Sequence, residues 1–350
     1  MPMISRRHRT FLGLGLFLWI LVGLTTPDLQ SLELDPEEAA SCPASLEAAE
    51  APGAVLPGDG EQGADGAGPT AGPPEGPPPT LTVLQGNLWM LPSRPLLVPY
   101  AFSADREERL ARLVATVRAC RPAVVLLQEV FERSTVELLA RHLPEYRVVD
   151  SGVTDVTGTI NASGLVTLTR LSAVDWSFRP FGPLPSGSRT IEWLAQKGVL
   201  AVEVEGPTFR GTLLNLHLYA FQDPGEAGIT ESQLREVVAW AESETAAGRS
   251  VLVGGDFNLG KERLAALLPE GWRLSSHGPT YDPARNPYTV RGSNNTPENH
   301  RERQEGRGTR TIDFLLTPEG TPARVESRVL DTLLLSDHQF LHHTVVLADG

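Results

Sequence analysis

The segment at residues 251–258 reads VLVGGDFN, in which apolar and small residues run directly into Asp256 and Asn258. A short apolar run of this kind is typical of a buried β-strand, and the pair Gly254–Gly255 predicts a sharp turn of the backbone where the strand ends. Side chains two residues apart on an extended segment point to the same side, so we expect the Asp256 carboxylate and the Asn258 amide to leave the strand together. An acid beside a neutral amide suits a site that holds an anion together with a proton or a metal ion.

Other apolar segments also carry polar side chains at or near their ends. Taken singly, an Asn or Asp after a strand is usually a turn residue, a Glu there is usually solvated, and a His in an apolar run is usually a core residue. Their recurrence predicts instead that several strands deliver polar groups to one sheet edge, where such groups form a site. The segments are LTVLQGNLW with Asn87, AVVLLQEV with Glu129, NLHLYA with Asn215 and His217, TIDFLL with Asp313, and LSDHQFL with Asp337 and His338.

The remaining pattern predicts a layered α/β domain. Helices are expected at residues 105–120, 134–142 and 231–247, with Ser134 as the N-cap of the second. Strands that are intermixed with a few helices, without regular alternation, favour mixed sheets. A long polar stretch at residues 282–309 predicts a surface loop near the site. Further strands are expected at residues 163–170, around Val174, at 199–204, at 208–216, around Val325 and at 342–348.

The first 80 residues differ in composition from the rest. A basic cluster at Arg6, Arg7 and Arg9 precedes an uncharged apolar run at residues 11–24. This layout predicts that residues 1–26 are a signal peptide or a membrane anchor and that the protein is exported, either secreted or attached to a membrane. Residues 27–80 are rich in Pro, Gly, Ala and Glu, which predicts a disordered acidic linker. The folded domain is then expected at residues 81–350.

Charge and cysteine content limit the possible classes. The first 80 residues hold 3 basic and 11 acidic residues, whereas the remainder holds 27 basic and 32 acidic residues. The acidity therefore belongs mainly to the tail, and a strongly basic nucleic-acid footprint is absent, which counts against a processive DNA-binding protein but not against a metal-assisted nuclease. Two cysteines do not make a disulfide framework, and Cys120 is expected to be a small buried hydrophobic residue.

The polar strand ends, taken in order, resemble those of the endonuclease/exonuclease/phosphatase superfamily, which has the deoxyribonuclease I-like fold. The resemblance spans about residues 81–347 and implies a four-layered α/β sandwich that cleaves phosphoesters with a divalent metal, Mg²⁺ or Mn²⁺. The motifs that carry it are QGNLW at Asn87, LLQEV at Glu129, NLHL at His217, GGDFN at Asp256 and Asn258, TIDFLL at Asp313, and LSDH at Asp337 and His338.

The resemblance also implies a metal site. Glu129 would be the main metal ligand, supported by Asn87 and by Asp337. One carboxylate with an amide oxygen, a second acid and several waters suits a hard cation such as Mg²⁺.

The same resemblance implies the catalytic roles. His338 would be the general base that activates water, and Asp313 would hold its working tautomer. Asp256 would orient the attacking water or assist at the leaving group. Asn258 and His217 would donate hydrogen bonds to the phosphoryl oxygens.

Shorter segments favour one substrate class within the family. NASGLVTLTR (161–170), QKGVL (196–200) and GPTYDPARNPY (278–288) are similar to segments of the neutral sphingomyelinase-like branch. They favour a phospholipase C that acts on a lipid head group. The alternatives are a secreted or membrane-anchored nuclease that acts on DNA or RNA, and a catalytically inactive binding module on a tether. We expect a monomer that associates with membranes through its N-terminal segment.

Overall fold

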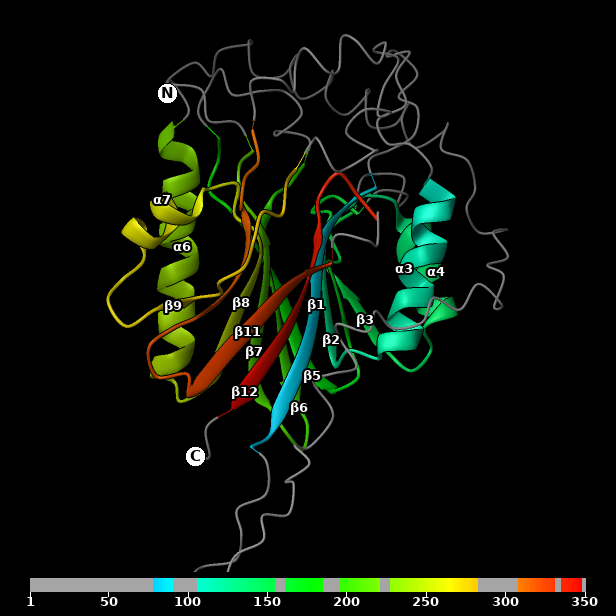
Figure 1. Cartoon of the computed structure of the whole chain (residues 1–350), viewed down its shortest axis with the longest axis horizontal. Helices are drawn as coiled ribbons and strands as arrows, with labels where there is room; N and C mark the ends of the chain where they lie inside the picture. Colours follow the sequence, from blue (N-terminus) through cyan, green and yellow to red (C-terminus); the bar gives the residue numbers. More distant parts are fainter. Residues whose placement is uncertain are drawn as a thin grey trace, which may run out of the picture.

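The computed structural model describes residues 78–90, 106–154, 161–184, 195–220, 227–282, 308–330 and 335–347. These residues form two six-stranded β-sheets that face one another, with helices on the outer side of each sheet (Figure 1). The segment expected at residues 1–26, nearly all of the linker expected at 27–80 and most of the loop expected at 282–309 lie outside the described residues. No helix in the described part combines the length and apolar character that a membrane crossing requires.

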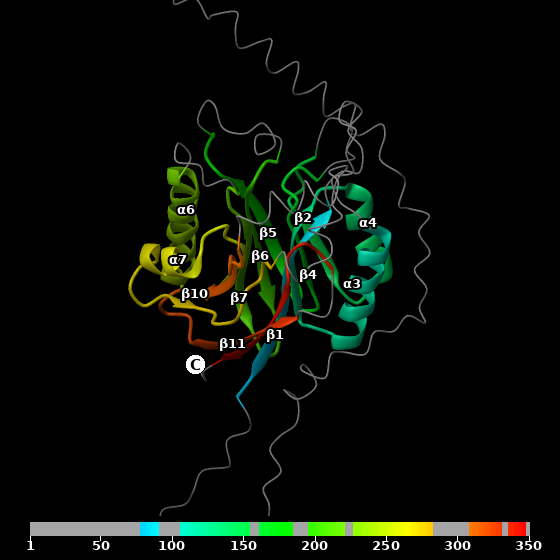
Figure 2. The same cartoon turned by 45° about the horizontal axis from the view of Figure 1, so that its top comes forward.

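The first sheet has the strand order β11-β12-β1-β2-β4-β3. Its strand β1 runs parallel to β2, and its other neighbouring strands are antiparallel. The helices α3 (Arg106–Cys120) and α4 (Arg133–His142) cover its outer face, as Figure 2 shows. The strands are β1 (Thr80–Met90), β2 (Val124–Val130), β3 (Arg147–Asp150), β4 (Val166–Thr169), β11 (Ala323–Leu330) and β12 (Phe340–Leu347).

The second sheet has the strand order β5-β6-β7-β8-β10-β9. Its strand β7 runs parallel to β8, and the other neighbours are antiparallel. The helices α6 (Ala227–Ala246) and α7 (Lys261–Leu267) lie on its outer side (Figure 1). The strands are β5 (Ser172–Pro180), β6 (Gly198–Glu205), β7 (Arg210–His217), β8 (Ser250–Asp256), β9 (Arg273–Leu274) and β10 (Asp313–Thr317).

Three apolar clusters fill the spaces between these layers. The middle cluster joins the two sheets through residues such as Val83, Leu126, Leu213 and Leu315, whereas the outer two join each sheet to its helices. Alternate residues of a strand face opposite sides, so the strands that are buried on both faces have nearly continuous apolar sequences. The predicted four-layered α/β sandwich is thereby confirmed.

Buried amide side chains connect the two sheets beneath the site. Gln85 Nε2 on β1 donates hydrogen bonds to the carbonyl oxygens of Gly255 at 3.2 Å and Phe314 at 3.1 Å, both in the opposite sheet. Asn215 on β7 accepts from Gln128 Nε2 at 2.7 Å. Buried hydrogen bonds between layers help to fix the register of the layers that they join. Asn215, which the sequence placed among the polar strand ends, therefore serves the packing of the two sheets.

The glycine pair in VLVGGDFN has a different role from the predicted one. Both residues lie within β8, which continues to Asp256. A Cβ atom on Gly254 would lie 2.5 Å from Gln85 Oε1, and one on Gly255 would lie 2.0 Å from the Leu216 carbonyl oxygen. The pair is therefore required for close approach of neighbouring strands and layers, and the prediction of a turn at these glycines is wrong.

Several local predictions also need correction. Helix α4 begins at Arg133, so Ser134 lies inside the helix; Glu132 occupies the N-cap position without a capping side-chain bond, because its carboxylate pairs with Arg106. Helix α6 begins four residues before the predicted start. Cys120 is only partly buried, whereas the sequence predicted a buried residue. Helix α7 and the short strands β3 and β9 were not predicted.

Candidate active site

The sheet topology brings the polar strand ends together. The parallel strands β1 and β2 end at one edge of the first sheet, and the parallel strands β7 and β8 end at one edge of the second. In the β7–β8 pair, His217 lies opposite Asp256. The antiparallel strand β10 begins at Asp313, which lies opposite the last residue of β8. The segment before β12 lies at the same end, because β12 runs antiparallel to β1. One edge of the sandwich therefore collects side chains that are far apart in the sequence.

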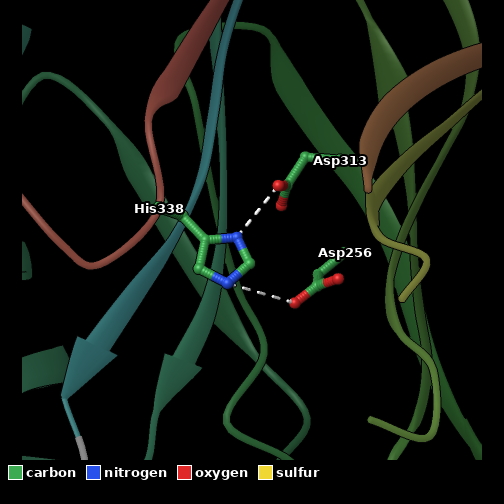
Figure 3. A group of neighbouring side chains, drawn as sticks. All are labelled: Asp256, Asp313 and His338. Atoms are coloured by element: carbon green, nitrogen blue, oxygen red, sulfur yellow. Dashed lines mark hydrogen bonds and ion pairs between the residues drawn. The ribbon is translucent and has the colours of Figure 1, made fainter. Parts of the chain in front are cut away.

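His338 lies between two buried aspartates (Figure 3). Its Nδ1 atom lies 2.9 Å from Asp313 Oδ2, and its Nε2 atom lies 3.8 Å from Asp256 Oδ2. Burial by itself would lower the pKa of His338, but the charges of Asp313 and Asp256 outweigh it and hold this pKa well above its ordinary value. The arrangement fixes the ring and stabilises a proton on it.

Asp256 is the centre of the polar cluster. Its Oδ2 accepts a hydrogen bond from Asn87 Nδ2 at 3.2 Å and lies 3.5 Å from His217 Nε2. Its Oδ1 accepts from the backbone N–H of Asn258 at 2.9 Å. Burial, followed by the charge of Asp313, raises the pKa of Asp256 to about 6. This carboxylate is costly to ionise and is held in place from three directions.

Asn258 reaches the site by a different path from the predicted one. Strand β8 ends at Asp256, and Asn258 has a left-handed φ of 51°, so the two side chains do not leave one extended segment together. The Asn258 Nδ2 atom donates to the Leu218 carbonyl oxygen at 3.1 Å. The same carbonyl accepts from Lys197 Nζ at 2.9 Å, which places the Asn258 amide and the Lys197 ammonium side by side.

Glu129 and Asp337 form the second acidic part of the site. Glu129 has a φ of 56°, which is uncommon for a residue other than glycine, and its side chain is 18% exposed. Burial and then the nearby charge of Asp337 raise the pKa of Glu129 to about 7. The Asn87 amide and the charge of Lys197 oppose this rise in the pKa of Glu129. Asp337 and Asn87 therefore lie near enough to Glu129 to influence the charge of its carboxyl group.

Lys197 belongs to the cluster, although the sequence marked it only as part of a short similarity. Its Nζ lies 3.1 Å from His217 Nε2, and the residue is 8% exposed. Burial, then the charge of Lys197, lowers the pKa of His217 well below its ordinary value, so this ring is neutral. An ammonium group can only donate, so His217 Nε2 accepts from it. A buried cation thus lies beside the acids.

The surroundings of the cluster include two features that the sequence did not predict. The Tyr281 ring meets the His338 ring edge to face at a centroid distance of 5.7 Å, and the Arg310 guanidinium lies 4.9 Å from the Tyr281 ring centroid. On the other side, Lys197 lines a pocket of about 320 Å³ together with Phe181, Leu184 and Tyr219. The site therefore has an aromatic and basic side next to His338, and a largely apolar pocket next to Lys197.

Two places in the cluster have donor sets that suit a cation. Ligand atoms of Asp256, Asp313 and His338 lie within 4.8 Å of one another. In that group, however, His338 Nδ1 is already bonded to Asp313. Glu129 and Asp337 offer oxygen atoms whose mutual repulsion a cation would relieve, which is the donor chemistry that hard divalent ions prefer.

Comparison with known proteins gives a family match. The sequence profile of the Endonuclease/Exonuclease/phosphatase family matches residues 84–338, a range that contains every predicted site residue. A comparison with curated proteins finds no match.

Solved structures with the same fold act on different molecules. Sphingomyelinase C from Streptomyces griseocarneus is 17% identical with a TM-score of 0.59, and the match covers 76% of this chain and 99% of that chain. Beta toxin from Staphylococcus aureus is 14% identical with a TM-score of 0.58, covering 75% and 99%. TDP2 from D. rerio, solved with a single-strand DNA product, is 18% identical with a TM-score of 0.55, covering 76% and 98%. At these identities the likeness shows the fold alone, and the fold does not decide the substrate.

Proposed function

Since the chain belongs to the endonuclease/exonuclease/phosphatase family of phosphoester hydrolases, we propose that it hydrolyses phosphodiesters by attack of a water that His338 activates, with a divalent cation held at Glu129. The observation that carries this proposal is the Asp313–His338–Asp256 array, in which one ring nitrogen is fixed by an aspartate and the other faces a second one. Such an array is the usual setting of a general base.

The two nitrogen atoms of His338 have separate tasks in this proposal. In its neutral form, His338 donates a hydrogen bond from Nδ1–H to the Asp313 carboxylate, which leaves a lone pair on Nε2 for the proton of the attacking water. As that proton arrives, the Asp313 carboxylate stabilises the imidazolium. The Asp256 carboxylate, 3.8 Å from Nε2, accepts the second proton of the water as a hydrogen bond and orients it.

The donor set at Glu129 fits a divalent cation. Burial, and then the charge of Asp337, raises the pKa of Glu129 to about 7, so the negative charge of Glu129 is poorly compensated in the protein alone. Glu129, Asn87 and Asp337 would hold Mg²⁺ or Mn²⁺. When bound, the ion neutralises charge on a phosphoryl oxygen and on the leaving oxygen.

The remaining donors are placed for the phosphoryl group. Lys197 places a positive charge 3.1 Å from His217 Nε2, and the amide of Asn258 lies beside it. Preorganised donors of this kind are worth most where charge develops and water is excluded. We assign Lys197 and Asn258 as hydrogen-bond donors to the phosphoryl oxygens. His217 would act indirectly, by holding Lys197 in place.

We propose a lipid phosphodiester as the substrate, in the manner of a sphingomyelinase-like phospholipase C. The support comes from the segments NASGLVTLTR and QKGVL, the second of which supplies Lys197. The largely apolar pocket beside Lys197 is suited to binding part of the substrate group that is esterified to the phosphate. A nuclease remains the competing function, since the same constellation serves both substrates.

A substrate panel separates these functions. The full chain is incubated with Mg²⁺ and sphingomyelin, phosphatidylcholine, phosphoinositides, plasmid DNA, RNA or an aryl phosphodiester, and each assay is repeated with His338→Gln. Release of a phosphorylated head group without nicking of DNA supports the lipid proposal. Cleavage of DNA or RNA without lipid turnover supports the nuclease. No turnover of any substrate would favour a binding module.

We also propose that the protein is exported and that it is a monomer. The basic cluster and apolar run within residues 1–26 support export, by secretion or by anchoring. Fractionation of cells that express the full chain or a chain without residues 1–26 tests it. Light scattering of the purified chain tests the monomer.

A further inference from the structure

Strand β1 is irregular where it delivers Asn87 to the site. Asn87 pairs with Gln128 and Met90 pairs with Val130, so Leu88 and Trp89 together lie opposite Glu129. This is a β-bulge, a device that bends a strand and re-aims its side chains. Trp89 has a φ of 50° and its N–H bonds to Asn87 Oδ1 at 3.0 Å, and Glu129 across from it is also left-handed. Two of the three proposed metal ligands, Asn87 and Glu129, are thus placed by irregular backbone.

The bulge turns two carbonyl groups toward a buried arginine on α3. Arg109 is 0% exposed. Its Nη1 atom donates to the Leu88 carbonyl oxygen at 2.6 Å, and its Nη2 atom donates to that of Trp89 at 3.1 Å. The Arg109 Cζ atom lies 5.4 Å from the Trp89 ring centroid. A buried carbonyl needs a donor, and a guanidinium supplies several in a fixed planar geometry.

The same guanidinium also binds the segment that carries the base. Arg109 Nη1 donates to the Leu335 carbonyl oxygen at 2.9 Å. Leu335 directly precedes Ser336, Asp337 and His338, and Ser336 Oγ bonds both to Asp337 and to the His338 N–H. The Arg109 side chain therefore connects the end of β1 to the start of the segment 335–338, although the two are far apart in the sequence.

We infer that Arg109 is a positioning residue that holds the bulge of β1 and the segment 335–338 in register, and so sets the metal-ligand group of Asn87, Glu129 and Asp337 against His338. The position of Arg109 between these two segments is independent of the reaction, whereas the effect on metal binding rests on the proposed function. Lysine cannot replace it fully, because one ammonium does not present the planar fork that reaches three carbonyls.

Arg106 provides a matched control one helical turn away. It lies on the same helix, is 8% exposed, and bonds with Nη1 to Glu132 Oε1 at 2.8 Å. Its contacts are at the start of α4 and not at β1 or at residues 335–338. Loss of either arginine removes a buried charge from α3, so both variants are expected to lower the stability of the fold. Only the Arg109 variant removes the tie between the two site segments.

The test compares Arg109→Met, Arg109→Lys and Arg106→Met in the full chain. Hydrogen exchange of peptides that cover residues 86–90 and 335–339 is measured by mass spectrometry, and Mn²⁺ binding is measured by calorimetry without substrate. Arg109→Met is expected to raise exchange in both segments, relative to the rest of the domain, and to raise the Mn²⁺ Kd, each by about tenfold or more. Arg109→Lys is expected to fall between it and the wild type. Arg106→Met is expected to leave both quantities within twofold or so of wild type.

Three results would overturn the inference. The first is unchanged exchange in both segments in Arg109→Met, or in Arg109→Lys if the Met variant does not fold. The second is an equal local increase in Arg106→Met, which would indicate a general weakening of α3. The third is unchanged Mn²⁺ affinity together with raised exchange, which would leave Arg109 a purely structural residue. If the wild type binds no Mn²⁺ but local exchange still rises, the metal proposal fails while the tie between the two segments stands.

Discussion

His338 Nδ1 lies 2.9 Å from Asp313 Oδ2, and both side chains are buried at the edge where the two sheets meet. The bond joins the first residue of β10 to the loop before β12, so it connects the two sheets as well as two chemical groups. The bond also decides which ring nitrogen can accept a proton from the attacking water. Nδ1 is bonded to Asp313, so Nε2 is the nitrogen that can do so. The account of the reaction depends on this relationship.

Replacement of His338 tests that relationship first. His338→Gln keeps the size and polarity of the side chain but cannot accept a proton at neutral pH, so kcat is expected to fall by about 10²- to 10⁴-fold with little change in stability. The measurement is the initial rate on the substrate that the panel identifies. His342→Gln is the control, because His342 is also a buried histidine, but burial and the charge of Arg328 lower its pKa and no aspartate of the cluster acts on it. Equal losses in the two variants would contradict the assignment.

The acidic limb of the pH profile is expected to move in Asp256→Asn. The base must be neutral, so the rate rises as pH rises through the pKa of His338. The Asp256 charge is one of the influences that hold this pKa above its ordinary value. Its removal lowers the pKa, so the acidic limb of kcat against pH shifts to lower pH even though the maximal rate falls. A shift to higher pH, or none, would speak against the coupling of these two groups.

Glu129 is expected to destabilise the protein when no cation is bound. Its pKa rises to about 7 in the folded state, so the stability that its protonated form provides is present at pH 4 and is lost as pH rises through 7. In chelator at pH 8, Glu129→Gln is therefore expected to be more stable than wild type by up to about 3 kcal/mol, and nearly equal to it at pH 4.

Urea unfolding at the two pH values measures this difference. Mg²⁺ is then expected to stabilise the wild type at pH 8 and to have little effect on Glu129→Gln. Glu137→Gln, on the exposed side of α4, is the control. Parallel pH dependences of the wild type and Glu129→Gln would show that the Glu129 carboxyl is not strained in the folded protein.

Lys197 is expected to matter in the transition state more than in substrate binding. Lys197→Met removes the buried cation and is expected to lower kcat by about 10²- to 10³-fold with a smaller change in KM. The chain has one other lysine, Lys261, which bonds to Ser276 at the surface. Lys261→Met is therefore a matched control, and its rate is expected to stay at the wild-type value. A rise in KM alone in Lys197→Met would assign Lys197 to ground-state binding.

The positions of Asn87, Glu129, Asp313 and His338 could be predicted because each belongs to a short apolar segment, and strands of one sheet end at shared edges. The fold class could be predicted for the same reason, since apolar runs and helical periodicity report directly on burial. The exact role of the Gly254–Gly255 pair could not, because close approach of a neighbouring layer is not visible in the local sequence.

Other site residues depend on long-range packing. Lys197 precedes its strand without any local pattern that distinguishes a buried lysine from an exposed one. Arg109 lies among the apolar positions of an amphipathic helix, where an arginine ordinarily faces water, yet it is fully buried because the bulge of β1 offers it carbonyl groups. Asn258 was placed at the site by sequence, but its left-handed backbone and its bond to the Leu218 carbonyl come from the turn after β8.

The most direct test of the central claim is the rate of phosphodiester hydrolysis as a function of free Mg²⁺. The purified full chain is first treated with excess chelator, and turnover of an aryl phosphodiester is then measured as Mg²⁺ is added back, with Glu129→Gln in parallel. The account predicts no turnover in chelator, saturable recovery in the wild type, and recovery in Glu129→Gln only at much higher Mg²⁺ or not at all. Full turnover by the wild type in excess chelator would contradict it.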